Sequence, residues 1–499
     1  MLRRNKYIII FLAVMMQTWI LNSCTDLDVD FDNSKPIEQG DGGFEGVDVP
    51  AMLVTAYGRL NTVAGVSYQG IPGIALVASD EMIIPTRATD WGNGGMHRVL
   101  HAHGWDAAHT EILSVWNNIH RGVYYTTQIM ASNPDANQAA QAKTLRGFYM
   151  YQLIDLFGQV AFREVTQGVN DHPRVLNRMD AFDFAVKDLT EAIPDLIDGG
   201  PTSDHTVVNK AFAYTILARL YLNKAVYEAS NPAGPYDFKA DAMNKVIEYC
   251  DKANEFGYSY ETNYFDNFSK DGGKELLLTF ANWSPYHWIQ VQLHGSQIGG
   301  WNGATTLGSF YDKFELTEQR IGYVPTNGVG RGFLIGIQYG DDGQPLKNKL
   351  GEPLNYTREI KLSGNPDYAG IRVLKYDPDI LKNKVPCVVM RYPEIRLMKA
   401  EAILRGGTAT KGETVQSIVD ELRTIRNASI IPVNLDMILD ERGREFYWEG
   451  VRRTDQIRFE TFTKTTWEGK DLKDDNKVLF PIPQLAMDSN PNLTQNTGY

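Results

Sequence analysis

The chain has 499 residues, a formal net charge of −12 and three cysteines. Its hydrophobic content of 43% and charged content of 22% are typical of folded proteins, so composition excludes a chain that is disordered throughout. The acidic balance argues against a nucleic-acid-binding protein, which would carry a basic surface. Three cysteines exclude a scaffold held together by many disulfides.

Residues 1–23 have the pattern of a secretory signal peptide. Basic residues precede an apolar run from Tyr7 to Leu21, which is too short to cross a bilayer core of about 30 Å. The run leads into Leu21–Cys24 (LNSC), which resembles the lipobox of bacterial lipoproteins. This resemblance implies cleavage before Cys24 and acylation of its thiol, which would anchor the chain in a membrane. The alternative is ordinary secretory cleavage near a chance cysteine.

Residues 24–49 are expected to form the acylated cysteine and a tether. Aspartates alternate with larger apolar residues from Thr25 to Asp32, and glycines are frequent from Gly40 to Gly46. Acidic residues directly after a lipidated cysteine are similar to the export signals of surface lipoproteins in Bacteroidota-type bacteria. A solvated linker without a signal is the alternative interpretation.

The body of the chain is predicted to be mostly α-helical. A 3.6-residue apolar period predicts helices around 108–130, 141–157, 180–197 and 209–229, with further helices near 240–256, 391–405, 413–427 and 434–449. Ala211, Ala218 and Ala225 recur at a helical spacing that lets two helices approach closely, which resembles a tetratricopeptide helix pair. We expect such pairs as a scaffold, with long irregular loops and a few short strands.

Long stretches rich in Gly, Asn and aromatic residues separate these helices, at 61–105, 258–310 and 322–390. They are too long to be simple connections. Loops of this kind on a rigid scaffold commonly carry function.

Three motifs together carry a family resemblance. The first is Ser79–Arg87 (SDEMIIPTR), continued by Asp90–Gly95; the second is Asp440–Gly450 (DERGREFYWEG); the third is the C-terminal segment Phe480–Tyr499, with FPIP and NPNLTQN. With the lipobox, they resemble the SusD/RagB family of outer-membrane nutrient-binding lipoproteins. The resemblance implies one helical domain over residues 50–499, with an N-terminal part to about 260 and a C-terminal part from about 261.

The resemblance also implies a function. Such proteins are lipid-anchored on the outer membrane, face the extracellular side, and form a lid over a SusC-like TonB-dependent transporter. They capture glycans and, less often, peptides. The expected function is therefore glycan capture and delivery to that transporter, with a peptide-binding lid as the alternative.

Trp91 is the first candidate for contact with a sugar. It lies in the Asp90–Gly95 loop (DWGNGG), which is too rich in glycine for a regular helix or strand. An aromatic face stacks on the C–H groups of a sugar ring. We expect Arg87 and Asn93 as its polar companions, and a Trp folded back as a loop plug is the alternative.

A second aromatic cluster follows in the next long loop. It contains Trp283, Tyr286, Trp288, Trp301 and Asn302. Aromatic residues in such loops are typical of SusD-like sugar binders, so these five complete the predicted ligand-binding set. Trp116 and Trp448 lie in helical patterns and are expected in the core.

The sequence gives weaker support for a metal site or for catalytic carboxylates. His97, His101, His103 and His109 are close together but lack a recognised ligand spacing, so no metal is expected. The Arg- and Glu-rich segment 440–453 is interpreted as a structural ion-pair network, with Gly450 ending its helix.

We expect neither catalysis nor a cofactor, because the chain lacks a G-x-S-x-G elbow, a Walker A loop and a Rossmann fingerprint. A glycoside hydrolase with two distant carboxylates and a lid without any ligand stay open as alternatives. Cys250 and Cys387 are expected to be buried, and the sequence does not decide whether they pair.

Overall fold

The computed structural model describes residues 46–65, 67–168, 170–280, 285–379 and 385–499, together with the backbone of 39–40 and 43–44. The predicted signal peptide, Cys24 and Trp283 lie outside the described residues.

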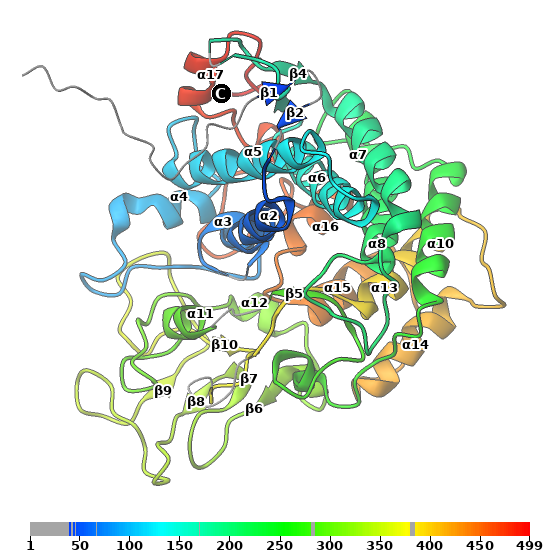
Figure 1. The fold of residues 1–499 in the computed structure, drawn as a ribbon. Helices are drawn as coiled ribbons and strands as arrows, with labels where there is room; N and C mark the ends of the chain where they lie inside the picture. The colour runs from blue at the N-terminus through cyan, green and yellow to red at the C-terminus, as the bar shows by residue number, and fades with distance from the viewer. Residues whose placement is uncertain are drawn as a thin grey trace, which may run out of the picture.

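Helices form most of the regular structure in this part of the chain, which confirms the predicted mostly α fold (Figure 1). The α-helices are α2 (Val49–Ala64), α3 (Gly70–Val77), α4 (Met96–His101), α5 (Thr110–Met130), α6 (Ala136–Leu156), α7 (Arg178–Ala192), α8 (Lys210–Leu222), α9 (Lys224–Glu228), α10 (Ala240–Asn254), α11 (Tyr286–Gln292), α12 (Gly308–Tyr311), α13 (Tyr392–Leu404), α14 (Val415–Ile425), α15 (Leu435–Phe446), α16 (Arg452–Arg458) and α17 (Gln484–Ser489). Short 3₁₀ helices are η1 (Asn93–Gly95), η2 (Ile193–Asp195), η3 (Tyr264–Phe268), η4 (Gln319–Ile321) and η5 (Asp475–Val478).

Neighbouring helices pack in pairs. α5 lies against α6, α6 against α7, α8 against α10, and α10 against α13. The alanines predicted to allow close approach, Ala211, Ala218 and Ala225, are all buried. Side-chain caps fix several helix starts, as where Asp135 and Gln138 form a reciprocal capping box at the start of α6. The helical run predicted over 209–229 divides at Asn223 into α8 and α9.

The strands are short and pair antiparallel in small sheets. They are β1 (Gln39–Gly40), β2 (Gly43–Phe44), β3 (Val160–Phe162), β4 (Arg174–Leu176), β5 (Leu276–Phe280), β6 (Gly322–Tyr323), β7 (Arg331–Leu334), β8 (Gly336–Ile337), β9 (Asn355–Tyr356), β10 (Arg372–Leu374) and β11 (Cys387–Arg391). β6, β7 and β10 form one sheet in the order β10-β7-β6, and β11 pairs with β5. Figure 1 shows β6–β10 gathered with α11 and α12 on one side of the helical layer, where the long loops lie.

The C-terminal motif ties the end of the chain to the helical scaffold. The Asn496 side chain donates hydrogen bonds to the carbonyls of Phe157 (3.0 Å) and Phe480 (2.7 Å). The Tyr499 hydroxyl donates to the Leu479 carbonyl at 2.9 Å and accepts a bond from the Trp105 indole at 2.7 Å. These contacts explain why the motif contains amides and a terminal aromatic residue.

Cys250 and Cys387 are both buried, and neither forms a disulfide. Burial raises the pKa of the Cys250 thiol, as expected for a packed cysteine rather than a reactive one. Among the described residues, no helix is both long enough and apolar enough to cross a membrane.

Candidate functional site

Four rings from separate loops and helices meet at one surface. They are Tyr68 from the loop before α3, Trp91 from the loop before η1, His287 from α11 and Trp301 from the loop after α11, and we call them the aromatic surface. Trp301 is 39% exposed and is the only exposed tryptophan among those described. His287 is exposed, whereas Tyr68 and Trp91 are half-buried.

The rings hold each other in defined orientations. His287 stacks on Trp301 with ring centroids 5.3 Å apart and an interplanar angle of 30°. Tyr68 meets Trp91 at 5.9 Å and Trp301 at 6.5 Å, in both cases edge to face. Both geometries are favourable for aromatic pairs. A ligand would therefore meet a preformed group of rings.

Backbone geometry places Trp91 in this group. Its φ of 62° is left-handed, which is uncommon for a residue with a large side chain and typical of functional loops. The indole nitrogen donates a hydrogen bond to the Trp301 carbonyl at 2.7 Å. The ring also packs directly on Gly303, where a Cβ would lie 2.4 Å from the indole. The loop is thus folded around a fixed, half-buried indole.

Polar groups lie beside the rings. The Asn93 side chain is exposed, and Arg98 supports the loop by donating to the carbonyls of Trp91 (3.5 Å) and Gly92 (3.3 Å). His97 is buried 6.2 Å from the Trp91 ring, and neither of its ring nitrogens has a hydrogen-bond partner among the described residues. Burial, reinforced by His109 and Arg98, lowers the pKa of His97 to about 4, so the ring is neutral at neutral pH.

Three of the predicted ligand-binding residues have buried side chains. Arg87 is 2% exposed and donates to the carbonyls of Ala369 (2.6 Å) and Pro366 (3.2 Å), so it braces a loop. Trp288 is 5% exposed and packs on Trp448 in the core, with centroids 5.4 Å apart.

Asn302 is the third of these residues. It donates to the Asp367 carbonyl at 2.8 Å and accepts a bond from Arg372 at 2.6 Å, so both ends of its amide are occupied. Tyr286 is half-buried beside His287, with centroids 6.0 Å apart, and stays a candidate at the margin of the surface.

Sequence reasoning missed Tyr68, His97 and His287. Tyr68 is a single aromatic residue between Ser67 and Gln69, and no pattern distinguishes it from a packing residue. His287 carried a weak signal, because it lies within the aromatic cluster that begins the second long loop.

The histidine cluster has structural partners. The Nε2 atoms of His101, His103 and His109 lie within hydrogen-bond distance of the carbonyls of Glu468 (2.6 Å), Ala78 (2.8 Å) and Met96 (3.1 Å) respectively. Among the described residues, no group of three or more His, Cys, Asp or Glu side chains is placed to hold a metal ion.

The Arg- and Glu-rich segment forms a buried ion-pair network around α15. Glu445 contacts Arg391 (2.9 Å), Arg426 (3.0 Å) and Arg320 (3.3 Å), and Glu441 contacts Arg320 at 2.8 Å. Burial by itself raises the pKa of both carboxyls, but the surrounding guanidinium groups outweigh it and hold both pKa values below the usual range. The structural interpretation of this segment is confirmed.

The end of this segment differs from the prediction. α15 stops at Phe446, four residues before Gly450, and Trp448 takes a left-handed φ of 60°. Glu449 therefore pairs with Lys375 (2.6 Å) and Arg391 (2.7 Å) instead of with the arginines that follow it. The turn after α15 depends on these partners, which are distant in sequence, so the spacing of residues within the segment could not predict it.

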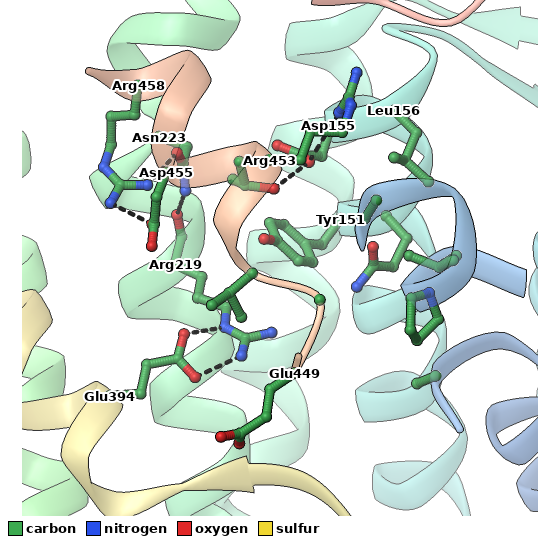
Figure 2. A pocket seen from close by; sticks show the side chains of 18 of the residues that line it. Tyr151, Asp155, Leu156, Arg219, Asn223, Glu394, Glu449, Arg453, Asp455 and Arg458 are labelled. Atoms are coloured by element: carbon green, nitrogen blue, oxygen red, sulfur yellow. Dashed lines mark hydrogen bonds and ion pairs between the residues drawn. The ribbon is translucent and has the colours of Figure 1, made fainter. Parts of the chain in front are cut away.

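A second polar region encloses a small internal cavity of about 60 Å³ (Figure 2). Figure 2 shows Arg219 facing Glu394 in a two-bond pair at 2.5 Å, and Arg458 facing Asp455 at 2.7 Å. This volume has room for a few water molecules but is too small for a sugar ring. We interpret it as part of the scaffold.

Comparison with known proteins agrees with the motifs. A model described as the SusD family matches residues 375–499. The starch-binding protein SusD of Bacteroides thetaiotaomicron is 25% identical over 432 residues, covering 75% of this chain and 75% of that protein.

Solved structures share the fold. A laminarin-binding SusD-like protein has a TM-score of 0.68 and 19% identity, covering 90% of this chain and 99% of the other. Surface glycan-binding protein A from Bacteroides uniformis has the same score and identity, covering 90% and 98%. A SusD superfamily protein from Parabacteroides distasonis has a TM-score of 0.69 and 17% identity, covering 90% of this chain and 98% of the other.

Residues 375–499 are thus similar to the SusD family, and about 90% of the chain shares the fold of SusD-like structures. The matched segment 375–499 contains α13–α17, much of the ion-pair network and the C-terminal tail. All four rings of the aromatic surface lie outside it. The family match therefore concerns the scaffold, while the candidate site is carried by the loops.

Proposed function

We propose that this protein is a cell-surface glycan-binding lipoprotein, which captures oligosaccharides on the aromatic surface and delivers them to a SusC-like TonB-dependent transporter. In this proposal residues 1–23 are removed, Cys24 is acylated, and 24–49 tether the domain to the outer membrane on its extracellular side. Relatives named as starch-binding, laminarin-binding and surface glycan-binding proteins support the ligand class.

The exposed Trp301 carries the proposal. A tryptophan that is 39% exposed, stacked on His287 and linked to Trp91 leaves apolar surface in water at a defined place. Sugar rings cover such surfaces with their C–H faces and direct their hydroxyls to nearby polar groups. Asn93, two residues after Trp91, is an exposed polar residue.

The alternatives have less support. A glycosidase needs two carboxylates on either side of the scissile bond, roughly 5–10 Å apart. Asp90 pairs with Lys349 at 2.9 Å, Asp80 with Arg452 at 2.8 Å, and Glu81 is buried. These acids serve as structural partners. A peptide-binding lid, or a lid without a ligand, is distinguished by the binding assay below.

The test is calorimetric titration of the mature protein with a panel of neutral oligosaccharides and peptides. Trp301→Ala and Trp91→Ala are expected to weaken glycan binding about tenfold each, since a lost stacking contact is worth roughly 0.5–1.5 kcal/mol plus buried area. Tyr323→Ala is the control, because Tyr323 is 58% exposed in β6. Unchanged affinity in both tryptophan variants, or binding of peptides alone, contradicts the proposal.

A further inference from the structure

A second, larger depression lies between α5, β3 and the C-terminal segment. Its volume is about 720 Å³, within the range of ligand sites. One wall is the α5 segment Trp116–Tyr124, and another is the segment Ala486–Leu493. We call it the α5 groove. Figure 1 shows α5, β4 and α17 together at one end of the molecule, and none of the aromatic-surface rings lines the groove.

The charge of the α5 groove is opposite to that of the chain. Among the described residues, no Asp or Glu lines it, whereas Arg121 and Arg163 do, in a chain with a net charge of −12. The Arg163 guanidinium donates to the carbonyls of Gly168 (2.6 Å) and Asp171 (2.7 Å), so no carboxylate neutralises it. Arg121 is exposed and makes no ion pair with a described residue.

The acids nearest in sequence to Arg163 are directed elsewhere. Glu164 pairs with Arg174 at 3.2 Å. The Asp171 carboxylate accepts a hydrogen bond from the Gly168 backbone at 2.7 Å. Neither of the two arginines forms an ion pair with a described carboxylate.

One face of α5 offers free polar groups to a ligand. Asn117, Arg121 and Tyr124 are four and three residues apart, so they lie on the same side of the helix. None of these three side chains makes a hydrogen bond to a described residue. The Asn117 amide can hydrogen-bond sugar hydroxyls, and the Arg121 guanidinium can pair with anionic groups. The Tyr124 ring can stack on the face of a sugar.

A peptide strand fits this groove less well. β3 pairs with β4 through the register Ala161↔Val175, and its other edge faces α5. On that edge the Ala161 N–H donates to His120 Nε2 at 3.1 Å, while His120 Nδ1 lies 2.8 Å from the Trp116 carbonyl. The backbone donor that a docking strand would use is thus already occupied.

We propose that the α5 groove is a second binding site, which takes an anionic oligosaccharide whose carboxylate or sulfate groups pair with Arg121 and Arg163. The site differs in chemistry from the aromatic surface and does not depend on it.

The experiment is titration of the mature protein with an oligogalacturonide, which carries carboxylates, and with a heparin oligosaccharide, which carries sulfates. Binding of either at millimolar concentration or tighter is expected, and it should weaken as salt rises. Arg121→Gln should weaken binding about tenfold, since it removes a charge-assisted contact. Lys347→Gln is the control for charge, because Lys347 is exposed in the loop between β8 and β9.

Trp301→Ala separates the two sites and is expected to bind anionic oligosaccharides as the wild type does. Several results would overturn the proposal: no binding of either oligosaccharide, an Arg121→Gln variant with wild-type affinity, or an equal loss in Lys347→Gln. A loss in Trp301→Ala would assign the ligand to the aromatic surface instead. Binding of an acidic peptide in place of both oligosaccharides would make the groove a peptide site.

Discussion

The Trp91 indole nitrogen donates a hydrogen bond to the Trp301 backbone carbonyl across 210 residues of sequence, at 2.7 Å. This bond joins the loop before η1 to the loop after α11, and Gly303 allows the close approach. Trp301 is therefore held beside Trp91 and Tyr68 while its ring stays partly exposed. The candidate site is a product of two loops that neither could form alone.

Gly303→Ala tests this arrangement without removing any aromatic ring. The new Cβ would lie 2.4 Å from the Trp91 ring, so the indole must move and its bond to Trp301 must lengthen. We expect glycan affinity to fall about tenfold or more in calorimetry, since preorganisation is lost. Gly58→Ala is the control, because a Cβ at this helical position meets nothing within 4 Å. Equal affinities in the two variants would show that Trp91 does not need this position.

Glu445→Gln should strongly destabilise the protein. Glu445 is fully buried among Arg320, Arg391 and Arg426, and loss of its charge leaves buried guanidinium groups uncompensated. The expected loss in the free energy of unfolding is about 3–5 kcal/mol, measured by urea denaturation. For the surface pair of Lys143 and Glu191, Glu191→Gln should cost at most about 1 kcal/mol. Similar losses in both variants would mean that the network contributes no more than a surface pair.

Stability should fall as the pH drops from about 6.5 towards 4. Burial lowers the pKa values of His97 and His120 from 6.5 to about 4, so the unfolded chain takes up protons at these residues before the folded protein does. Their contribution is fully present above pH 6.5 and is lost on acidification through this window. His97→Gln should reduce the number of protons taken up on unfolding by about one in this pH window. The measurement is the pH dependence of the unfolding free energy, obtained from urea titrations at several pH values. A slope that stays the same would show that His97 does not titrate in this way.

Cys24→Ser tests the proposed anchor in a bacterial host that acylates lipoproteins. Without its thiol the chain cannot be diacylated, and membrane association should be lost, since about two acyl chains are needed for stable anchoring. The measurement is the share of protein in the membrane fraction and its release by detergent. Cys250→Ser is the control for cysteine loss, because Cys250 is buried in α10. Unchanged membrane association of Cys24→Ser would contradict the anchor.

Transfer to a transporter needs a separate experiment. Affinity purification of the acylated protein from its native membrane should recover a TonB-dependent transporter. Recovery should not require the aromatic surface, so Trp301→Ala is expected to retain the partner. A protein purified without any such transporter would remove the delivery step from the proposal while leaving glycan binding intact.

Several features followed from the sequence alone because they depend on local patterns. The 3.6-residue period of apolar residues predicted α5, α6, α7 and α10, since a helix buries one face of its own residues. The same period placed Trp116 and Trp448 in the core, and both are buried. The crowding of Arg and Glu in one segment indicated a structural network, because charges at such density need partners.

Only the tertiary structure decided which loop residues face solvent. Trp288 and Trp301 occur in the same aromatic cluster, yet Trp288 packs on Trp448 while Trp301 is exposed. Arg87 precedes the loop that carries Trp91, yet its side chain is buried and donates to the carbonyls of Pro366 and Ala369. In the same way, Tyr68 joins the site without a local signal. The exposure of a side chain in these loops depends on contacts between residues hundreds of positions apart. Such contacts do not produce a periodic pattern in the sequence.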